Sequence, residues 1–239
     1  MERWRGKWAL VTGASAGIGW ALAEQLAAGG TNLVLTARRQ ERLEQLARQL
    51  DQKSGTDVEV IVADLERPST PERIFEFTEQ RSIAIDLLIN NAGFGAYGEF
   101  HRIDLARQLA MVQVNISAVV HLTHLYLRPM IERRRGDILI VASTAGFQGL
   151  PYLTTYAATK AFDLHFAEAL AEEMRGYGVR VCALCPGPTA TEFHQVLRAG
   201  ELTGGHRFVP HTAEMVAETI LKAVETGEPE LVVTHTPVV

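Results

Sequence analysis

The segment Trp8–Gly19 reads WALVTGASAGIG. Its first five residues are apolar or β-branched, which is typical of a buried strand. The glycine-rich turn that follows runs into the helical pattern WALAEQLAAGG. A strand, a glycine-rich turn and a helix in this order present free backbone N–H groups to an anion. The spacing GxxxGxG differs from the GxGxxG of the general dinucleotide fingerprint, so a tight structural turn is the alternative.

Apolar runs and amphipathic helical patterns alternate along the rest of the chain. Long helical patterns cover roughly Leu105–Arg135 and Tyr152–Gly176. The alternation predicts an α/β fold: a single Rossmann-type doubly wound parallel sheet of about seven strands with helices on both faces. No repeat or linker divides the chain, and we expect one dinucleotide-binding and catalytic domain over residues 1–239. The predicted strands are Trp8–Thr12, Asn32–Thr36, Val58–Val62, Asp86–Asn90, Asp137–Ala142, Arg180–Cys185 and Leu231–Thr234.

The composition is that of a folded globular protein. The 239 residues are 47% hydrophobic and 21% charged, which is ordinary for such chains. A net charge of −5 offers no basic field, so we expect no nucleic-acid partner. No run of about 18 apolar residues is present, and we expect no membrane span. The short apolar N-terminal segment leads into a glycine-rich turn instead of a cleavage site, so we expect a cytoplasmic protein.

Two groups of side chains resemble metal or redox sites without completing one. Cys182 and Cys185 have CxxC spacing within an apolar run, where odd spacing points side chains to opposite faces of a strand. We interpret them as buried, reduced thiols. His121 and His124 are three residues apart on a predicted helix, but no further ligand completes the set, and we predict no metal.

Two arginines follow the second predicted strand, at the place where NAD-binding sheets usually carry an acid for the ribose 2′-hydroxyl. Arg38 and Arg39 stand there, with no acid beside them. Two guanidinium groups suit a 2′-phosphate. The alternative is a solvated helix start, where basic charge is slightly unfavourable. The pair therefore predicts NADP(H), with NAD(H) as the less favoured cofactor.

Polar residues also follow the next two strands. Asp64-Leu65 comes after the third strand, and Asn90-Asn91-Ala92-Gly93 comes after the fourth. The carboxyl ends of parallel strands are where open α/β sheets bind ligands. Taken singly, each segment is equally compatible with an ordinary Asx-type turn.

A tyrosine and a lysine four residues apart are the candidate catalytic pair. Tyr156 and Lys160 share one face of a predicted helix. A lysine cation lowers a phenol pKa toward the range useful for proton exchange; the alternative is a core tyrosine beside a surface lysine. Ser143 follows the fifth strand at the same sheet edge. Asn115 stands among apolar residues of the long helix, where a satisfied structural amide is the alternative.

These motifs together resemble the short-chain dehydrogenase/reductase family, of the classical type, over essentially the whole chain. TGASAGIG is similar to the family's cofactor turn and NNAG to its fourth-strand motif. Asn115, Ser143, Tyr156 and Lys160 match its catalytic tetrad. NNAGFGAYGEF and TARR are similar to bacterial ketoacyl-reductase-like NADP-dependent oxidoreductases.

The resemblance implies an NADP(H)-dependent oxidoreductase that acts on a carbonyl or secondary alcohol. Tyr156 would be the general acid/base and Ser143 would polarise the substrate oxygen. Lys160 would hold the nicotinamide ribose, and Asn115 would anchor a water. Asp64 would meet the adenine. The implied cofactor-binding residues are Gly13, Ser15, Ala16, Gly17, Ile18, Gly19, Arg38, Arg39, Asp64, Leu65, Asn91, Ala92, Gly93, Tyr156, Lys160, Pro186, Gly187, Thr189 and Thr191.

The resemblance also implies a substrate lid at about residues 192–211 and assembly as a homodimer or homotetramer through the two long helices. The lid segment is apolar with several glycines, which suits an apolar substrate; a surface loop with a short packed helix is the alternative. An NAD(H) enzyme of the same family and a non-catalytic nucleotide-binding sensor or scaffold are the competing functions. The expected substrate pocket comprises Phe94, Ser143, Phe147, Leu150, Tyr152 and Phe193.

Overall fold

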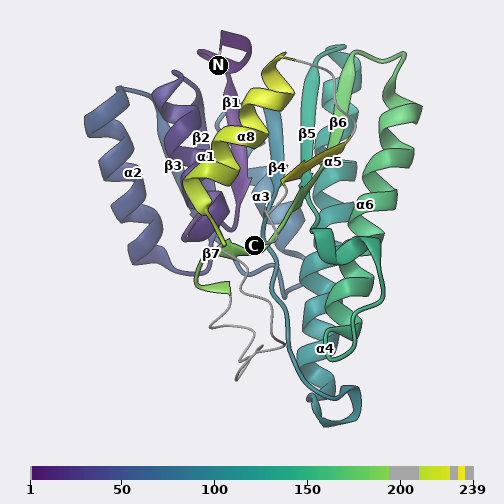
Figure 1. Ribbon diagram of the computed structural model, residues 1–239. Helices are drawn as coiled ribbons and strands as arrows, with labels where there is room; N and C mark the ends of the chain where they lie inside the picture. Colours follow the sequence, from purple (N-terminus) through teal and green to yellow (C-terminus); the bar gives the residue numbers. More distant parts are fainter. Residues whose placement is uncertain (1, 194–209, 227–230, 235–239) are drawn as a thin grey trace.

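A computed structural model describes residues 2–193, 210–226 and 231–234 of the chain. Seven parallel strands form one sheet in the order β3-β2-β1-β4-β5-β6-β9 (Figure 1). The strand order reverses between β1 and β4, which is the switch point where such sheets bind ligands. The predicted doubly wound α/β fold is thus confirmed. The strands are β1 (Trp8–Thr12), β2 (Asn32–Ala37), β3 (Val58–Val62), β4 (Ile85–Asn90), β5 (Gly136–Val141), β6 (Val179–Pro186) and β9 (Leu231–Thr234).

The ends of some strands differ from the prediction by one residue. At these ends the backbone hydrogen bonds of the sheet extend beyond the run of apolar side chains. β5 and β6 pair from Gly136 and Val179 onward, although glycine carries no apolar signal. A second, two-stranded sheet was not predicted at all. It joins β7 (Thr189–Ala190) to β8 (His211–Thr212), whose two-residue strands are too short for any alternation to show.

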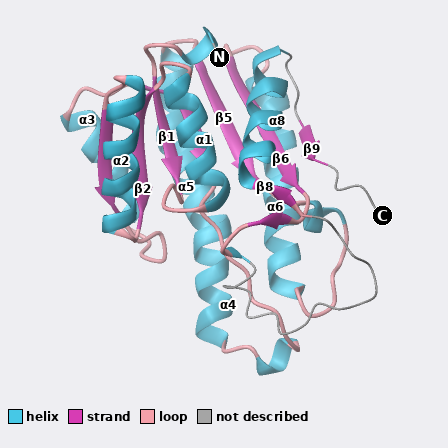
Figure 2. Ribbon diagram, turned by 60° about the vertical axis from the view of Figure 1, so that its left-hand side comes forward, coloured by secondary structure: helices cyan, strands magenta, loops and turns pink. Residues whose placement is uncertain are grey.

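Helices cover both faces of the sheet (Figures 1 and 2). They pack there because each carries an apolar stripe, such as Leu43, Leu46 and Leu50, which are all buried. The first face carries α1 (Gly17–Ala28), α2 (Gln40–Ser54) and α8 (Ala213–Thr226). The second face carries α3 (Thr70–Gln80), α4 (Leu105–Val112), α5 (Ala118–Glu132) and α6 (Thr154–Met174).

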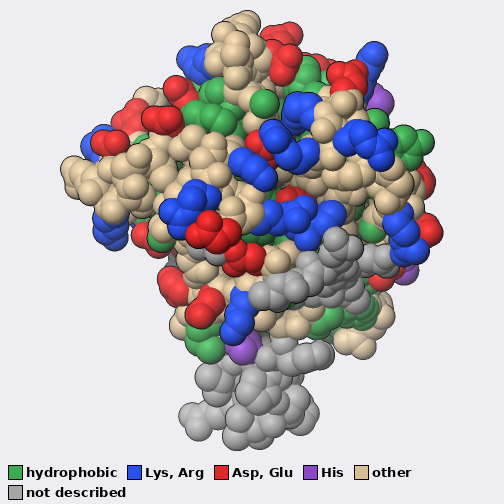
Figure 3. All heavy atoms as spheres, turned by 90° about the horizontal axis from the view of Figure 1, so that it is seen from above, with side chains coloured by type: hydrophobic (Ala, Val, Ile, Leu, Met, Phe, Trp, Pro, Cys, Tyr) green, Lys and Arg blue, Asp and Glu red, His purple; other side chains and the backbone are tan. Residues whose placement is uncertain are grey.

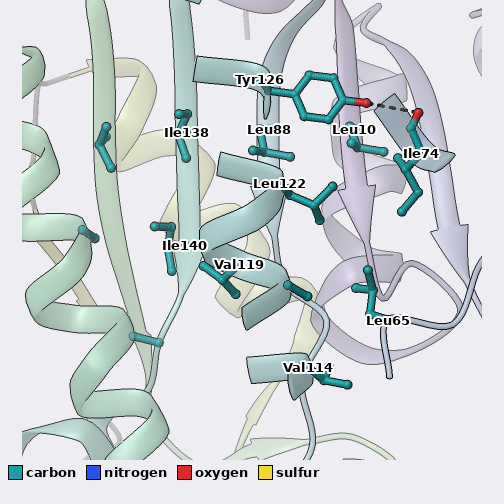
Figure 4. Packing of buried hydrophobic residues seen from close by; sticks show 14 of the residues in the cluster. Leu10, Leu65, Ile74, Leu88, Val114, Val119, Leu122, Tyr126, Ile138 and Ile140 are labelled. Carbon is teal, nitrogen blue, oxygen red and sulfur yellow. Dashed lines mark hydrogen bonds between the residues drawn. The ribbon is translucent and has the colours of Figure 1, made fainter. Parts of the chain in front are cut away.

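Each face of the sheet therefore has its own apolar core. Figure 4 shows the second core, where Leu122 and Tyr126 of α5 pack over the sheet and Tyr126 Oη donates to the carbonyl oxygen of Ile74 on α3, at 3.3 Å. The two cysteines, both free, are buried in different cores: Cys182 in the first and Cys185 in the second. Their predicted placement on opposite strand faces is confirmed.

The long helix on the second face is interrupted by one π-helical turn, η3 (Gln113–Ser117), between α4 and α5. Its whole span, Leu105–Glu132, is 28 residues, and by length and composition alone it is apolar enough to cross a membrane, with a mean hydropathy of 1.2 in its most apolar 18-residue window. No such segment was expected from the sequence, because the chain has no uninterrupted apolar run of about 18 residues. In the structure 44% of the most apolar window is buried against the rest of the molecule.

At the end of the sheet where the parallel strands begin, arginine side chains pair with acidic residues. Figure 3 looks onto this edge and shows Lys and Arg side chains gathered near its centre. Asp137 of β5 accepts hydrogen bonds from Arg3, from Trp4 Nε1 and from Arg180 of β6, at 2.7–3.0 Å. Arg135 pairs with Asp86 of β4 at 2.7 Å. These contacts attach the N-terminal turn to β5 and link β5 to its neighbours β4 and β6.

Candidate active site

The glycine-rich turn leads from β1 into α1. Gly13 (φ +68°) and Gly17 (φ +56°) adopt the left-handed backbone that favours glycine. A Cβ at Gly13 would lie 2.9 Å from Cα of Ala92, so the turn packs directly on the segment after β4. Ala16 precedes α1 and has no side chain that can cap it. The first N–H groups of α1 are therefore available to an anionic ligand.

Thr12, the last residue of β1, ties this turn to the segment after β4. Its Oγ1 accepts hydrogen bonds from the backbone N–H groups of Asn91 and Ala92, both at 2.9 Å. Asn91 Nδ2 donates to the carbonyl oxygen of Thr12 at 2.8 Å. These bonds align two walls of the predicted cofactor site. Thr12 was not predicted as a site residue, although a polar residue that ends an apolar strand is itself a signal.

Arg38 and Arg39 each have an acidic partner. Arg38 Nη1 lies 2.7 Å from Glu66 Oε1, and Arg39 Nη1 lies 2.7 Å from Glu192 Oε2. Arg39 also donates to the hydroxyl and the carbonyl oxygen of Ser15, both at 3.2 Å. The Arg39 guanidinium is thereby attached to the glycine-rich turn, whereas Arg38 is directed toward the segment after β3.

Glu192 bridges two arginines of α2's N-terminal region. Its Oε1 lies 3.3 Å from Nη2 of Arg42. Three arginines against two glutamates leave this cluster one positive charge in excess. Neither glutamate was predicted, because Glu66 is 28 residues from Arg38 and Glu192 is 153 residues from Arg39, and no local pattern connects them.

The segment after β3 forms a local turn. The Asp64 carboxylate accepts a hydrogen bond from the N–H of Glu66 at 3.1 Å. The backbone carbonyl oxygen of Asp64 accepts one from Thr70 Oγ1 at 2.7 Å. Leu65 is buried in the second core. This Asx-type turn carries Glu66 to Arg38. The contact between Asp64 and an adenine stays a prediction.

Ser143, Tyr156 and Lys160 meet at the carboxyl end of β5. Ser143 lies just beyond β5, and its Oγ accepts a hydrogen bond at 3.1 Å from the N–H of Ala145 in the short helix η4 (Thr144–Phe147). Tyr156 and Lys160 are buried one turn apart on α6. The Ser143 hydroxyl hydrogen-bonds the phenol of Tyr156. The structure therefore brings three predicted catalytic residues together.

Asn115, the fourth, lies in η3 with its side chain fully buried. Its Oδ1 accepts a hydrogen bond from the N–H of Phe94 at 3.1 Å. Its Nδ2 donates to the carbonyl oxygen of Phe94 and to Thr159 Oγ1, both at 3.0 Å. The amide fastens the segment after β4 to α6, as the structural alternative supposed. The water that the resemblance implies stays a prediction.

The Lys160 ammonium is held by two oxygen atoms. It donates to the carbonyl oxygen of Val141 at 2.7 Å and to Asp163 Oδ2 at 2.9 Å. Asp163 is fully buried. This carboxylate was not predicted, although an acid three residues after a candidate lysine on a helix can pair with it.

Burial raises the pKa of Tyr156 above its ordinary value of 10.0. The Lys160 ammonium and the hydrogen bond from Ser143 lower this pKa, while the Asp163 carboxylate raises it further; the net direction is upward. The expected effect of the lysine is thus present but is outweighed by desolvation. Tyr156 is therefore protonated at neutral pH, which is the form that a proton donor needs.

The segment after β6 folds back toward the glycine-rich turn. β6 ends at Pro186, and the N–H of Gly187 donates to Thr234 Oγ1 at 3.2 Å. Thr189 Oγ1 donates to the carbonyl oxygen of Gly187 at 2.9 Å. Thr191 packs on Gly17, where a Cβ would lie 3.1 Å from its methyl carbon. Thr191 therefore reaches the start of α1.

The residues predicted to line the substrate pocket differ in their burial and contacts. The Phe193 ring contacts the Tyr156 ring at 5.3 Å between centroids. Phe147 and Tyr152 are about half exposed, at 50% and 49%. Phe94 belongs to the second core. Leu150 is partly buried.

The predicted lid, 192–211, is described only at its two ends, and its residues 194–209 lie outside the described part of the chain.

Of the two histidines considered as metal ligands, His121 pairs with an acid: its Nε2 lies 3.1 Å from Glu72 Oε1. Within residues 2–193, 210–226 and 231–234, no group of three or more His, Cys, Asp and Glu side chains is placed to hold a metal ion.

Comparison with known proteins identifies the relatives of this chain. The family model described as short chain dehydrogenase matches residues 7–202. The 7beta-hydroxysteroid dehydrogenase of Clostridium sardiniense is 34% identical over 186 residues, which are 78% of this chain and 70% of that protein. The very-long-chain 3-oxoacyl-CoA reductase of Anas platyrhynchos is 37% identical over 196 residues, 80% of this chain and 62% of that protein. The chain thus spans about two thirds of the length of these relatives.

A solved structure shares the fold over nearly the whole chain. The short-chain dehydrogenase from Sphingobium yanoikuyae in complex with NADPH superimposes with a TM-score of 0.88 at 29% sequence identity. The match covers 95% of this chain and 87% of that one. The similarity drawn from the motifs is therefore confirmed by sequence and by structure.

Proposed function

Because the chain belongs to the short-chain dehydrogenase family, we propose that it is an NADP(H)-dependent oxidoreductase acting on a carbonyl or secondary alcohol group. The observation that carries the proposal is the cluster of Ser143, Tyr156 and Lys160, in which the tyrosine and the lysine are buried. The cluster lies at the carboxyl edge of the sheet, the edge on which the glycine-rich turn also lies. A phenol, a cation and a hydroxyl grouped in this way are suited to proton exchange with a substrate oxygen.

The residues present fit a nicotinamide dinucleotide phosphate. The uncapped start of α1 suits a pyrophosphate. The Arg39 guanidinium, placed over Ser15, suits a 2′-phosphate. When bound, this cofactor supplies or accepts the hydride. The solved relative from Sphingobium yanoikuyae contains NADPH, which supports the choice of cofactor.

In the reducing direction Tyr156 donates its phenolic proton to the carbonyl oxygen of the substrate. Ser143 donates a hydrogen bond to the same oxygen and stabilises the charge that develops on it. The Lys160 ammonium stabilises the phenolate that is left, as its lowering effect on the pKa of Tyr156 indicates. Asn115 keeps α6 and the segment after β4 in register through its three hydrogen bonds. Oxidation of an alcohol reverses these proton movements.

We propose a bulky, apolar substrate. The Phe193 ring lies against Tyr156, and Phe147 and Tyr152 expose about half of their surface. Exposed aromatic side chains in the segments that flank a catalytic residue are typical of an apolar pocket. The names of two relatives agree with this class, since one is a hydroxysteroid dehydrogenase and the other a 3-oxoacyl-CoA reductase.

Two other functions remain to be separated by experiment. An NAD(H)-dependent enzyme is favoured by one observation: Glu66 and Glu192 already pair with the arginines proposed for the 2′-phosphate. A non-catalytic nucleotide sensor or scaffold is disfavoured by the intact grouping of Ser143, Tyr156 and Lys160.

We further propose assembly as a homodimer or homotetramer. Leu105 and Leu109 lie one turn apart on α4 and are 66% and 59% exposed. Large exposed apolar side chains on one helix face are typical of an interface. The cytoplasmic location expected from the sequence stays a prediction.

The test is consumption of reduced nicotinamide, followed by absorbance, with NADPH and NADH and a panel of steroid ketones, aliphatic ketones and 3-oxoacyl thioesters. Binding of each cofactor is measured separately by fluorescence. We expect turnover with NADPH preferred over NADH. Preference for NADH would overturn the cofactor assignment. Binding without turnover across the panel would favour the sensor, and binding of neither cofactor would contradict the proposal.

A further inference from the structure

Asp163 is a buried acid that the proposed reaction does not use. It lies on α6, three residues after Lys160, and is 0% exposed. Its Oδ2 accepts the hydrogen bond from the Lys160 ammonium at 2.9 Å. Its Oδ1 has no hydrogen-bond partner among the described residues. The carboxylate is therefore held through Lys160 rather than by a network of its own.

Packing gives no reason for an acid at this position. Leu164, Ala167 and Leu170 of the same helix are buried in the second core, and an apolar side chain would suit that environment. A buried ion pair seldom stabilises a fold more than apolar residues of similar volume. A carboxylate oxygen left without a partner makes the aspartate less favourable still. A role exerted through Lys160 accounts for the residue better.

The two contacts of Lys160 fix where its charge lies. Val141, which accepts one hydrogen bond, is the last residue of β5 and precedes Ser143 by two positions. Asp163, one turn after Lys160 on α6, accepts the second hydrogen bond. An ammonium group has three N–H donors, so one remains for a ligand or for Tyr156.

Other ionisable groups face this pair from α6 and β6. Tyr156 precedes Lys160 by one turn, and Cys185 of β6 faces the Lys160 ammonium. Burial raises the pKa of the Cys185 thiol to about 11, so it is neutral near pH 7. Glu168, farther along α6, acts on Cys185. In the described part of the chain, Asp163 is thus the carboxylate that pairs with the ammonium.

We infer that Asp163 is a positioning residue, which holds the Lys160 ammonium at the end of β5 and offsets the charge that Tyr156 experiences. The inference rests on the proposed function, since proton exchange at Tyr156 is what this arrangement would serve. The sign of the effect is defined. Lys160 lowers the pKa of Tyr156 and Asp163 raises it, so removal of the carboxylate charge lowers the pKa of Tyr156.

The test compares three variants of the full chain. Asp163→Asn keeps the shape and removes the charge, whereas Asp163→Glu keeps the charge. Glu172→Gln is the matched control, because it removes one charge from an exposed position of α6 that pairs with Arg175. If Asp163→Asn does not fold, Asp163→Ser replaces it and leaves room for a water beside the ammonium.

Two readouts follow the same proton. The first is tyrosinate absorbance of the cofactor-free protein during alkaline titration, taken as the difference from the same protein carrying Tyr156→Phe. The second is the pH profile of kcat. For Asp163→Asn we expect both midpoints to fall by about one pH unit, in the reducing and the oxidising direction alike. Asp163→Glu and Glu172→Gln should keep the wild-type midpoints.

Unchanged midpoints in a folded Asp163→Asn or Asp163→Ser protein would overturn the inference, even if kcat fell. An equal shift in Glu172→Gln would also overturn it, because the effect would then be one of overall charge. The titration needs neither cofactor nor substrate. Absence of turnover would therefore count against the proposed function, while the titration would still decide the role of Asp163.

Discussion

At the scale of single residues, Tyr156 is subject to opposing effects. Burial and Asp163 raise its pKa, whereas Lys160 and Ser143 lower it. The phenol carries its proton in the free protein, and the cation that facilitates release of that proton is itself held by an acid. The chemistry of Tyr156 therefore depends on three neighbours from β5 and α6, and each can be changed separately.

Arg39 is expected to select the cofactor. Arg39→Gln removes the guanidinium that lies over Ser15, and charge-assisted hydrogen bonds of this kind contribute enough to change affinity about 10-fold to 100-fold. We expect the Kd of NADPH to rise by that factor and the Kd of NADH to change little, as measured by fluorescence titration. Arg48→Gln, at an exposed position of α2, is the control. Equal weakening of both cofactors would argue against the 2′-phosphate assignment.

Site residues were predictable where their position in a pattern carries meaning. Ser143 follows an apolar strand, and Tyr156 and Lys160 have helical spacing. Glu192 was not predictable, because its contact with Arg39 joins residues 153 positions apart. Asp163 was missed for another reason: its spacing from Lys160 is visible in the sequence, but propensity alone does not say which acid on a helix is buried and has a partner.

At the scale of elements, the fit of η4 against α6 sets the distance between Ser143 and Tyr156. A Cβ at Gly146 would lie 2.6 Å from the backbone carbonyl oxygen of Lys160. Gly146→Ala should therefore push η4 away from α6. We expect a loss of stability of about 1–3 kcal/mol and a fall in kcat, measured by urea unfolding and by turnover.

Gly149→Ala is the matched control for that change. No atom lies within 4 Å of a Cβ at Gly149, and the residue belongs to the same short segment. This variant should unfold and turn over like the parent. Loss of the same size in both variants would mean that the segment responds to any added methyl group, and the close packing of η4 on α6 would not be the cause.

The Asp137 cluster should make stability depend on pH. Burial alone would raise the pKa of Asp137, but hydrogen bonds from Arg3 and Arg180 more than offset it, and the net pKa lies below the ordinary 3.8. A lowered pKa stabilises the fold above the unfolded-state value, and this contribution is lost as pH falls through the folded value. Thermal unfolding temperature should therefore fall as the pH drops below about 4.

Asp137→Asn should remove part of that dependence. The variant removes the carboxylate charge with which both Arg3 and Arg180 pair. We expect the free energy of unfolding to fall by roughly 2–4 kcal/mol near pH 7, as measured by urea unfolding. The lower part of this range applies because Arg3 is 38% exposed and its pairing is screened. An unfolding temperature with the same slope against acid pH in both proteins would show that Asp137 is not the group responsible.

The strands were predictable to within one residue and the long helices to within two or three. The strands and α6 lie close to their expected positions. The strands were predictable because a parallel strand that is buried on both faces consists of a nearly continuous run of apolar residues. The π-helical turn at Gln113–Ser117 and the β7–β8 pair were not predicted. Both depend on a local choice of backbone hydrogen bonds that the side-chain pattern does not encode.

At the scale of the whole molecule, the strand order gathers the site. β1, β4 and β5 are neighbours in the sheet, although β2 and β3 lie between β1 and β4 in the sequence. Their carboxyl ends bring together the glycine-rich turn, the segment held by Thr12, and Ser143. Sequence alternation was sufficient to predict this sheet, since right-handed crossovers leave few other topologies.

Assembly should depend on α4. Leu109→Lys places a charge on its exposed apolar face, and we expect it to weaken a homodimer or homotetramer, as measured by light scattering after size exclusion. Met215→Lys, a comparable change at a 51% exposed position of α8, is the control. A monomeric wild-type protein, or equal effects of the two variants, would contradict this interface.

The proposed reaction depends on proton exchange between Tyr156 and the substrate oxygen. The most direct measurement compares kcat of Tyr156→Phe with that of Tyr177→Phe, a control at a 47% exposed position, while NADPH affinity is measured separately. We predict that Tyr156→Phe loses about 10²-fold to 10⁴-fold in kcat with nearly unchanged affinity for NADPH, and that Tyr177→Phe keeps full activity. Turnover by Tyr156→Phe at the rate of the control would contradict the claim.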